Sequence, residues 1–172
     1  MRKIRLKGKN GDGKFAAVDD EDYDYLIQWE WFVVIAKSTC YASRIEDGKR
    51  ISMHRAIMNP TSKKLVDHKD RNGLNNQKSN LRVCTHSQNQ YNKTSVFNSS
   101  SKYLGVSVLN QRNPHDKKVY KYWRAQINNR LGHTHIISKF PYNEWGEIEA
   151  AIAYNEAAKY YYGEFANLNI IK

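Results

Sequence analysis

Short apolar runs separated by polar turns characterise the first fifty residues of the chain. Alternating, β-branched or aromatic runs of this kind predict strands rather than long helices. An acidic segment beginning at Asp19 or Asp20 favours the start of a short helix that continues through Leu26. The expected strands are residues 15–18, 29–35, 39–45 and, after a turn at 46–49, 50–54. This part of the chain therefore predicts a small antiparallel β platform.

The pattern changes between residues 54 and 93, where basic and amide side chains dominate and apolar residues are sparse. Leu65-Val66 and Leu81–Val83 predict two short strands, and Lys69–Lys78 forms a polar loop between them. A helix should then begin at Thr85 or Ser87 and run to about Tyr91. We expect a hairpin followed by a short helix.

A second unit follows the polar, Ser/Asn-rich residues 94–101, which are expected to be a linker. Apolar residues spaced as on one helix face predict a helix from Glu147 to Tyr162, ended by Gly163. Three strands should precede this helix, at residues 103–109, 122–128 and 133–140, joined by a long turn at 110–121 and a short one at 129–132.

These elements predict an α+β fold with two domains. Residues 1–93 should form the platform, hairpin and short helix, and residues 102–172 a three-stranded antiparallel sheet packed on one helix. The length suits one medium or two small domains of roughly 50–150 residues.

The charge is strongly basic, with a net charge of +11 and an isoelectric point near 9.6. Residues 1–50 contribute +1 (10 Lys/Arg against 9 Asp/Glu), residues 51–100 contribute +6 (8 against 2) and residues 101–172 contribute +4 (10 against 6). A phosphate-rich partner is the first expectation, and a ribosome-associated or merely basic protein is the alternative. The phosphate-binding surface should lie in the middle and C-terminal parts.

Other classes of protein are disfavoured by the sequence. Cys40 and Cys84 form no CxxC pattern, so we expect free thiols and neither a zinc site nor a disulfide scaffold. The N-terminus lacks the apolar segment of a signal peptide, and no run approaches the ~20 apolar residues of a membrane span. A cytoplasmic protein is expected.

The candidate chemistry lies in Asp67-His68, Asn80 and Asn89. Hydrolysis of a phosphodiester needs a base to take a proton from water and positive charge to stabilise the phosphate and leaving oxygens. Histidine titrates near neutral pH, and Asp and Asn offer the oxygen ligands that Mg²⁺ accepts alongside phosphate. A hairpin followed by a helix could bring these residues together.

The run from Val66 to Lys93, VDHKDRNGLNNQKSNLRVCTHSQNQYNK, preceded by Met53-His-Arg55, resembles the HNH endonucleases of the phage and intron-encoded homing type. The resemblance implies a ββα-metal module over residues 54–93. It implies that His68 is the general base, that Asp67 and Asn89 hold one divalent ion, Mg²⁺ or Mn²⁺, and that Asn80 holds the loop and orients His68. No zinc is expected.

The remaining histidines lack comparable support. We expect His54 to have a structural or phosphate-contact role and His86 to lie on the surface of the helix. His133 and His135 share one face of a strand, where contact with solvent or phosphate is more plausible than metal binding.

Residues 102–169 resemble the DNA-binding domain of plant ethylene-response factors, the APETALA2 type, through YLGV, WRAQI, AAIAYNEAA and GEFANLN. The resemblance implies a sheet that enters the major groove. Strand alternation independently places Trp123, Ala125 and Ile127 on the helix and turns Arg124, Gln126 and Asn128 outward. Arg and Gln can contact guanine and adenine edges, although a merely solvated sheet face is the alternative for Arg124 and Gln126. Plant arginines replaced here by Leu104, Ser107 and Leu109 exclude a transfer of the plant target.

The sequence thus predicts a homing-type endonuclease from a phage or other mobile element, acting on double-stranded DNA and, if phage-encoded, in a bacterial host cell. No membrane and no obligate protein partner is expected. Further candidate DNA contacts are Arg71, Arg82, Lys118 and Lys121. A DNA-binding regulator that no longer cuts is the main alternative, and RNA binding ranks below it because aromatic–basic stacking pairs are not evident.

Overall fold

The computed structural model describes residues 1–36, 39–92, 99–128 and 133–171. The chain divides into two compact units, Met1–Asn89 and Gln90–Lys172. Most of the expected linker, residues 94–98, and the expected turn at 129–132 lie outside the described residues. None of the described helices is long and apolar enough to cross a membrane.

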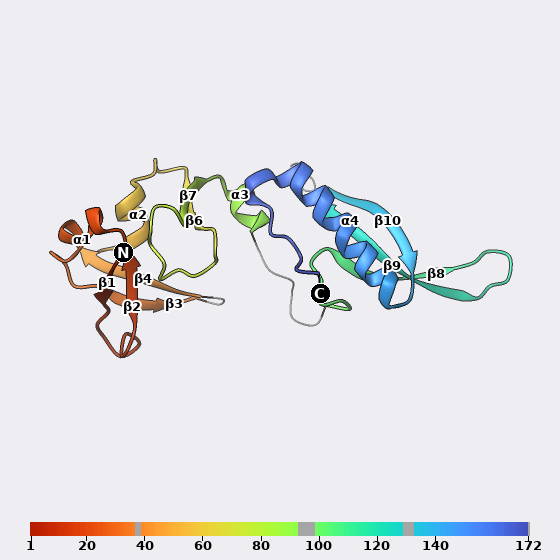
Figure 1. The fold of residues 1–172 in the computed structure, drawn as a ribbon, viewed down its shortest axis with the longest axis horizontal. Coiled ribbons are helices and arrows are strands. Elements are labelled where there is room, and N and C mark those ends of the chain that lie inside the picture. The colour runs from red at the N-terminus through yellow and green to blue at the C-terminus, as the bar shows by residue number, and fades with distance from the viewer. Residues whose placement is uncertain (37–38, 93–98, 129–132, 172) are drawn as a thin grey trace. The chain divides into compact units, whose positions relative to one another are not determined.

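The first unit begins with the platform (Figure 1). Two small antiparallel sheets and two short helices surround one apolar core that includes Leu26, Trp31 and Met53. Strands β3, β4 and β5 lie in that order in the larger sheet. The elements are β1 (Arg2–Arg5), β2 (Phe15–Val18), α1 (Asp20–Leu26), β3 (Phe32–Ile35), β4 (Cys40–Glu46), β5 (Lys49–Ser52) and α2 (Met53–Met58).

Two expected strands of the platform have other bounds, and two of its elements, α2 and β1, were not expected. The strand expected at 50–54 ends at Ser52, because Met53 is fully buried in the core and starts α2, which the sequence pattern did not reveal. The strand expected at 29–35 begins only at Phe32. The buried Trp31 indole donates from Nε1 to the Leu26 carbonyl (2.8 Å), so this residue closes the end of α1 instead of extending the sheet. Strand β1 was also not anticipated.

The hairpin and helix expected from the motif are present. Strands β6 (Leu65–His68) and β7 (Leu81–Cys84) pair antiparallel, with Asp67 opposite Arg82 and His68 opposite Leu81. Helix α3 (His86–Tyr91) follows. The long loop between the strands, residues 69–80, is therefore tied at its base to the ends of both strands.

The second unit is a three-stranded antiparallel sheet, ordered β10-β9-β8, with a long helix over one face (Figure 1). The alternation expected in the middle strand is confirmed: Trp123, Ala125 and Ile127 are buried, and they belong to the clusters formed with residues of the helix. The elements are β8 (Val106–Arg112), β9 (Val119–Asn128), β10 (Thr134–Pro141), α4 (Glu144–Tyr162) and the 3₁₀ turn η1 (Gly163–Phe165).

Three boundaries in this unit differ from expectation. The strand expected from residue 103 begins only at Val106, after Gly105, which has φ of +74°. Helix α4 begins three residues early, because Asn143 accepts a hydrogen bond from the Gly146 N–H (2.8 Å) and caps it. The turn expected at 110–121 is mostly strand: β8 and β9 continue to the pair Arg112–Val119, so only six residues turn the chain. The result is a β hairpin that extends past the third strand.

Candidate active site

Asp67 and His68 lie side by side at the end of β6, and both are buried (7% and 5% exposed). Successive strand residues point to opposite faces, so the two side chains contact different parts of the unit. Asp67 turns to the strand partner Arg82, whereas His68 turns to the loop and to the platform. The carboxylate and the imidazole therefore belong to adjacent residues but lie on opposite faces of the hairpin.

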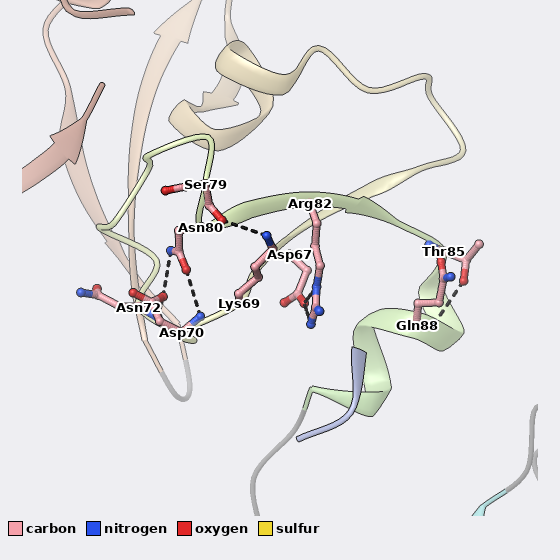
Figure 2. Close-up of polar contacts among 9 residues, drawn as sticks. All are labelled: Asp67, Lys69, Asp70, Asn72, Ser79, Asn80, Arg82, Thr85 and Gln88. Carbon is pink, nitrogen blue, oxygen red and sulfur yellow. Dashed lines mark hydrogen bonds and ion pairs between the residues drawn. The ribbon is translucent and has the colours of Figure 1, made fainter. Parts of the chain in front are cut away.

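The carboxylate of Asp67 forms a buried ion pair with Arg82 (Figure 2). Arg82 donates from Nε (2.9 Å) and Nη2 (2.7 Å) to Oδ2 of Asp67, and the two side chains are only 10% and 9% exposed. Two charge-assisted hydrogen bonds fix the orientation of the carboxylate. Arg82, which the sequence analysis expects to contact DNA, is buried in this ion pair.

His68 is enclosed by three side chains. Its Nε2 lies 3.2 Å from Oδ1 of Asn76, and its ring centroid lies 5.0 Å from that of His54 and 5.8 Å from that of Tyr41. Burial lowers the pKa of His68 below its ordinary value, against the opposing effect of Asn76. A lowered pKa keeps the imidazole neutral near pH 7, as a general base requires.

Asn76 is completely buried, and its Nδ2 has no partner among the described residues. The backbone N–H of Asn76 donates to the Ala17 carbonyl (2.8 Å), which fixes this part of the loop to β2. Burying an amide is costly unless it is hydrogen-bonded, so a buried amide directed at His68 indicates a role in the site. Because a carbonyl oxygen only accepts, this contact places the imidazole proton on Nε2.

His54, on α2, packs its ring edge-on against His68. Burial, together with the nearby His68 and Arg55, lowers the pKa of His54 to about 3. A neutral His54 avoids placing a second positive charge beside the proposed base. The sequence predicted only a structural or phosphate-contact role here, and the structure gives the residue a definite neighbour.

Asn80 organises the loop (Figure 2). Its Oδ1 accepts from the Asp70 N–H (3.0 Å), and its Nδ2 donates to Asp70 Oδ1 (2.9 Å) and to the Asn75 carbonyl (2.8 Å). Asp70 in turn accepts from the Asn72 N–H (2.8 Å) and from Asn75 Nδ2 (2.8 Å), and its pKa is lowered by these hydrogen bonds despite the desolvation that opposes them. Holding the loop was the role expected of Asn80, but the side chain that meets His68 is Asn76.

The loop is also anchored to the platform. Asp19, which precedes α1, accepts from Gln77 Nε2 (3.0 Å) and from the Lys78 N–H (2.7 Å). The Gln77 hydrogen bond is the main cause of the lowered pKa of Asp19. The site is therefore built on a rigid loop with two independent attachments.

Asn89 lies on α3 and is half-buried. The helix starts with a reciprocal capping box: the Thr85 N–H donates to Gln88 Oε1 (2.8 Å), and the Gln88 N–H donates to Thr85 Oγ1 (3.2 Å) (Figure 2). Among the described residues, no hydrogen bond joins Asn89 to Asp67. The structure thus brings Asp67 and His68 together with Asn76 and Arg82, and leaves Asn89 on the adjacent helix.

The candidate metal ligands, Asp67 and Asn89, are both oxygen donors. Within the described ranges, no group of three or more His, Cys, Asp or Glu side chains could hold a metal, and Cys40 and Cys84 are free. One carboxylate and one amide suit a hard ion such as Mg²⁺, which keeps waters and takes phosphate oxygens instead of a full protein cage. Asp67 and Asn89 are the chain's own candidates for such a site.

The expected DNA contacts occupy different surroundings. Arg71 is exposed on the loop, with φ of +64° and its N–H bonded to the His68 carbonyl (2.9 Å). Arg124 and Gln126 are half-buried on the sheet face away from α4, where Arg124 donates to Ser107 Oγ (3.1 and 3.3 Å). Lys121 alternates to the other side of β9, and its Nζ lies 5.5 Å from the Tyr142 ring centroid.

Other open-face and hairpin residues were also expected to meet DNA. Asn128 is exposed at the end of β9 and accepts from Thr134 Oγ1 (2.8 Å), and Lys118 is exposed in the turn between β8 and β9.

Sequence reasoning missed Asn76 and Tyr41, two neighbours of His68. The only signal for Asn76 was the Asn75-Asn76 pair within the motif, which gave no reason to prefer one amide over the other.

Comparison with known proteins gives the family of the chain. Residues 59–91 match a family model described as HNH endonuclease. The chain is 34% identical over 167 residues to a protein of Acanthamoeba polyphaga mimivirus named "Uncharacterized HNH endonuclease L560", covering 94% of this chain and 78% of that protein. No solved structure matches significantly. The chain therefore belongs to the HNH endonuclease family of DNA-cleaving enzymes.

Proposed function

We propose that the chain is a homing-type, divalent-metal-dependent endonuclease of double-stranded DNA, with its catalytic centre at the end of β6. The observation that carries this proposal is the buried Asp67-His68 pair: an oriented carboxylate and a neutral imidazole on adjacent residues of one hairpin. In this proposal, β6, β7 and α3 together serve as the ββα-metal module.

His68 acts as the general base. With its proton on Nε2 and donated to Asn76, the imidazole carries its lone pair on Nδ1, and this atom accepts the proton of the attacking water. Asn76 is a positioning residue in this scheme, because it selects the tautomer and the ring orientation without touching the substrate. His54 and Tyr41 enclose the ring from the platform side.

Asp67 and Asn89 would hold the divalent ion, Mg²⁺ or Mn²⁺, with the scissile phosphate and water completing its ligands. The ion supplies positive charge that stabilises the phosphate and the leaving oxygen. Arg82 keeps the Asp67 carboxylate oriented before DNA arrives. Asn80 maintains the loop through Asp70 and thereby keeps Asn76 beside His68.

The second unit binds DNA through the sheet face opposite α4, as the resemblance to APETALA2-type domains implies. Arg124, Gln126 and Asn128 are carried on that face of β9 at alternate positions. Side chains at this spacing can reach base edges in the major groove. Lys118, and Arg71 in the first unit, are exposed cations that suit phosphate oxygens.

The test is incubation of the purified chain with supercoiled plasmid and Mg²⁺, with excess EDTA as the control. Conversion to nicked or linear DNA that EDTA abolishes, with defined ends on sequencing, is the expected result. Binding without any cleavage in Mg²⁺ or Mn²⁺ would instead identify a non-cleaving DNA-binding regulator.

A further inference from the structure

The hairpin formed by the ends of β8 and β9 extends beyond the rest of the second unit (Figure 1). Strand β10 pairs with β9 only from Tyr122 to Asn128, whereas β8 pairs with β9 as far as Arg112–Val119. The last three strand pairs and the turn, residues 110–121, therefore have no third strand beside them. We call this two-stranded segment the arm.

The arm carries a dense positive charge. It contains four Lys or Arg residues against one Asp, a formal charge of +3 by 4 − 1, and all its residues but Asn113 are exposed. The basic residues are Arg112, Lys117, Lys118 and Lys121. A two-stranded β ribbon has dimensions that the major groove of DNA admits.

The tip of the arm is ordered by its own hydrogen bonds. Asn113 joins both sides of the turn: its N–H donates to the Lys118 carbonyl (2.8 Å), its carbonyl accepts from the Lys117 N–H (3.0 Å), and its Oδ1 accepts from the His115 N–H (2.9 Å). Arg112 Nε donates to the Lys117 carbonyl (3.2 Å). Lys117 itself adopts φ of +61°, a conformation that a non-glycine residue keeps only when its surroundings impose it.

Asp116 is the single acidic residue of the arm, and both of its carboxylate oxygens accept hydrogen bonds within the tip. Its Oδ1 accepts from the Lys118 N–H (2.9 Å), and its Oδ2 accepts from the Tyr120 hydroxyl (2.5 Å). The Tyr120 bond, followed by the Lys118 bond, lowers the pKa of Asp116, so the side chain is a carboxylate near neutral pH. An anion is thus placed among the cations as a structural brace.

We propose that the arm is a separate DNA-binding element, distinct from the open sheet face, which grips phosphates through Arg112, Lys117 and Lys118, and that Asp116 increases DNA affinity by bracing its tip. This inference rests on the proposed DNA-binding function of the second unit. The expected effect of removing Asp116 on DNA affinity is opposite to the usual one. Removing an exposed acid from a DNA-binding surface ordinarily strengthens binding, because repulsion from phosphate is lost. Here removal should weaken it, because ordering the lysines at binding then costs conformational entropy.

The experiment measures binding of the full chain to a fluorescent duplex in EDTA, which prevents cleavage, at several salt concentrations. Asp116→Ala should lower affinity roughly threefold to tenfold, as loss of preorganisation predicts. Tyr120→Phe, which removes one brace without changing charge, should lower affinity in the same direction. Glu156→Ala is the matched control: it removes an exposed acid from α4 and should leave affinity unchanged or slightly higher.

The triple variant Arg112→Ala/Lys117→Ala/Lys118→Ala should reduce the salt slope of log K by about 2.7, since each phosphate contact contributes about 0.9. Tighter binding by Asp116→Ala, or an unchanged slope in the triple variant, would overturn the arm proposal while leaving DNA binding by the sheet face intact. A wild-type chain with no affinity for duplex DNA at low salt would overturn the proposed function as well.

Discussion

Breaking the Asp67–Arg82 pair from the arginine side gives the sharpest test of how strands β6 and β7 are held together. Arg82→Met retains much of the aliphatic stem but leaves the Asp67 carboxylate buried, at 9% side-chain exposure, without its two guanidinium donors. Removing one partner of a buried pair costs about 3–5 kcal/mol. Because both side chains keep some contact with water, we expect a cost at the lower end of this range, about 3 kcal/mol.

That loss is large for a unit of this size. Domains of roughly 60–100 residues lose about 4–8 °C in Tm per kcal/mol, so the first unit should melt about 12–24 °C lower. Urea unfolding followed by tryptophan fluorescence measures the change, since Trp29 and Trp31 both belong to the first unit. Lys7→Met is the control, because it breaks the exposed pair with Glu30 and should cost less than about 1 kcal/mol.

A compensating variant separates the charge from the packing. Asp67→Leu combined with Arg82→Met should recover most of the stability, because an apolar pair of similar volume replaces a buried ion pair at little cost. If Arg82→Met unfolded within 1 kcal/mol of the wild type, or if the double variant were less stable than the single one, the buried pair would not be the element that holds β6 to β7.

Three further outcomes are expected. The pKa of His54 is about 3 in the folded chain and about 6.5 in the unfolded chain, so between these values the unfolded state binds more protons. The free energy of unfolding should therefore fall as the pH drops from 6.5 toward 3, by up to about 1.4 kcal/mol per pH unit. Denaturant titrations at pH 7, 6, 5 and 4 should show a smaller fall for His54→Phe. Asn76→Leu should remove the preference of His68 for a proton on Nε2, measured by imidazole ¹⁵N chemical shifts, and slow cleavage roughly 10- to 100-fold. Asn76→Asp should keep this tautomer, because it keeps the acceptor oxygen. An unchanged tautomer in Asn76→Leu would refute the positioning role. Arg124→Ala should cost about 1–3 kcal/mol of affinity on a preferred site and much less on random DNA, and equal losses in binding titrations would make it a phosphate contact.

The sequence predicted best where a motif and a strand pattern coincide. Asp67 and His68 end a strand, and Asn80 sits on the loop, because the spacing of the motif matches a hairpin with its return strand. The sheet and helix of the second unit followed from the alternation in β9 and the spacing of alanines in α4. These features are local, so the chain itself displays them.

What escaped prediction depends on tertiary contacts. Helix α2 has no side-chain cap at Ser52 and exists because Met53 is buried in the platform core. Asn75 and Asn76 are chemically identical, and only the attachment of the loop to β2 decides which amide meets His68. The arm looked like a long loop because the strand residues just before its turn, Asn110–Arg112, are all polar and lead into Asn113-Pro114.

The central claim is that His68 activates water at this site. The direct measurement is the single-turnover cleavage rate of His68→Ala at saturating protein, together with its DNA affinity in EDTA. General-base assistance contributes roughly 10²–10⁴-fold, so the rate should fall by that factor while DNA affinity stays within about twofold of wild type. A variant that binds equally well and cleaves within a few-fold of the wild-type rate would contradict the account.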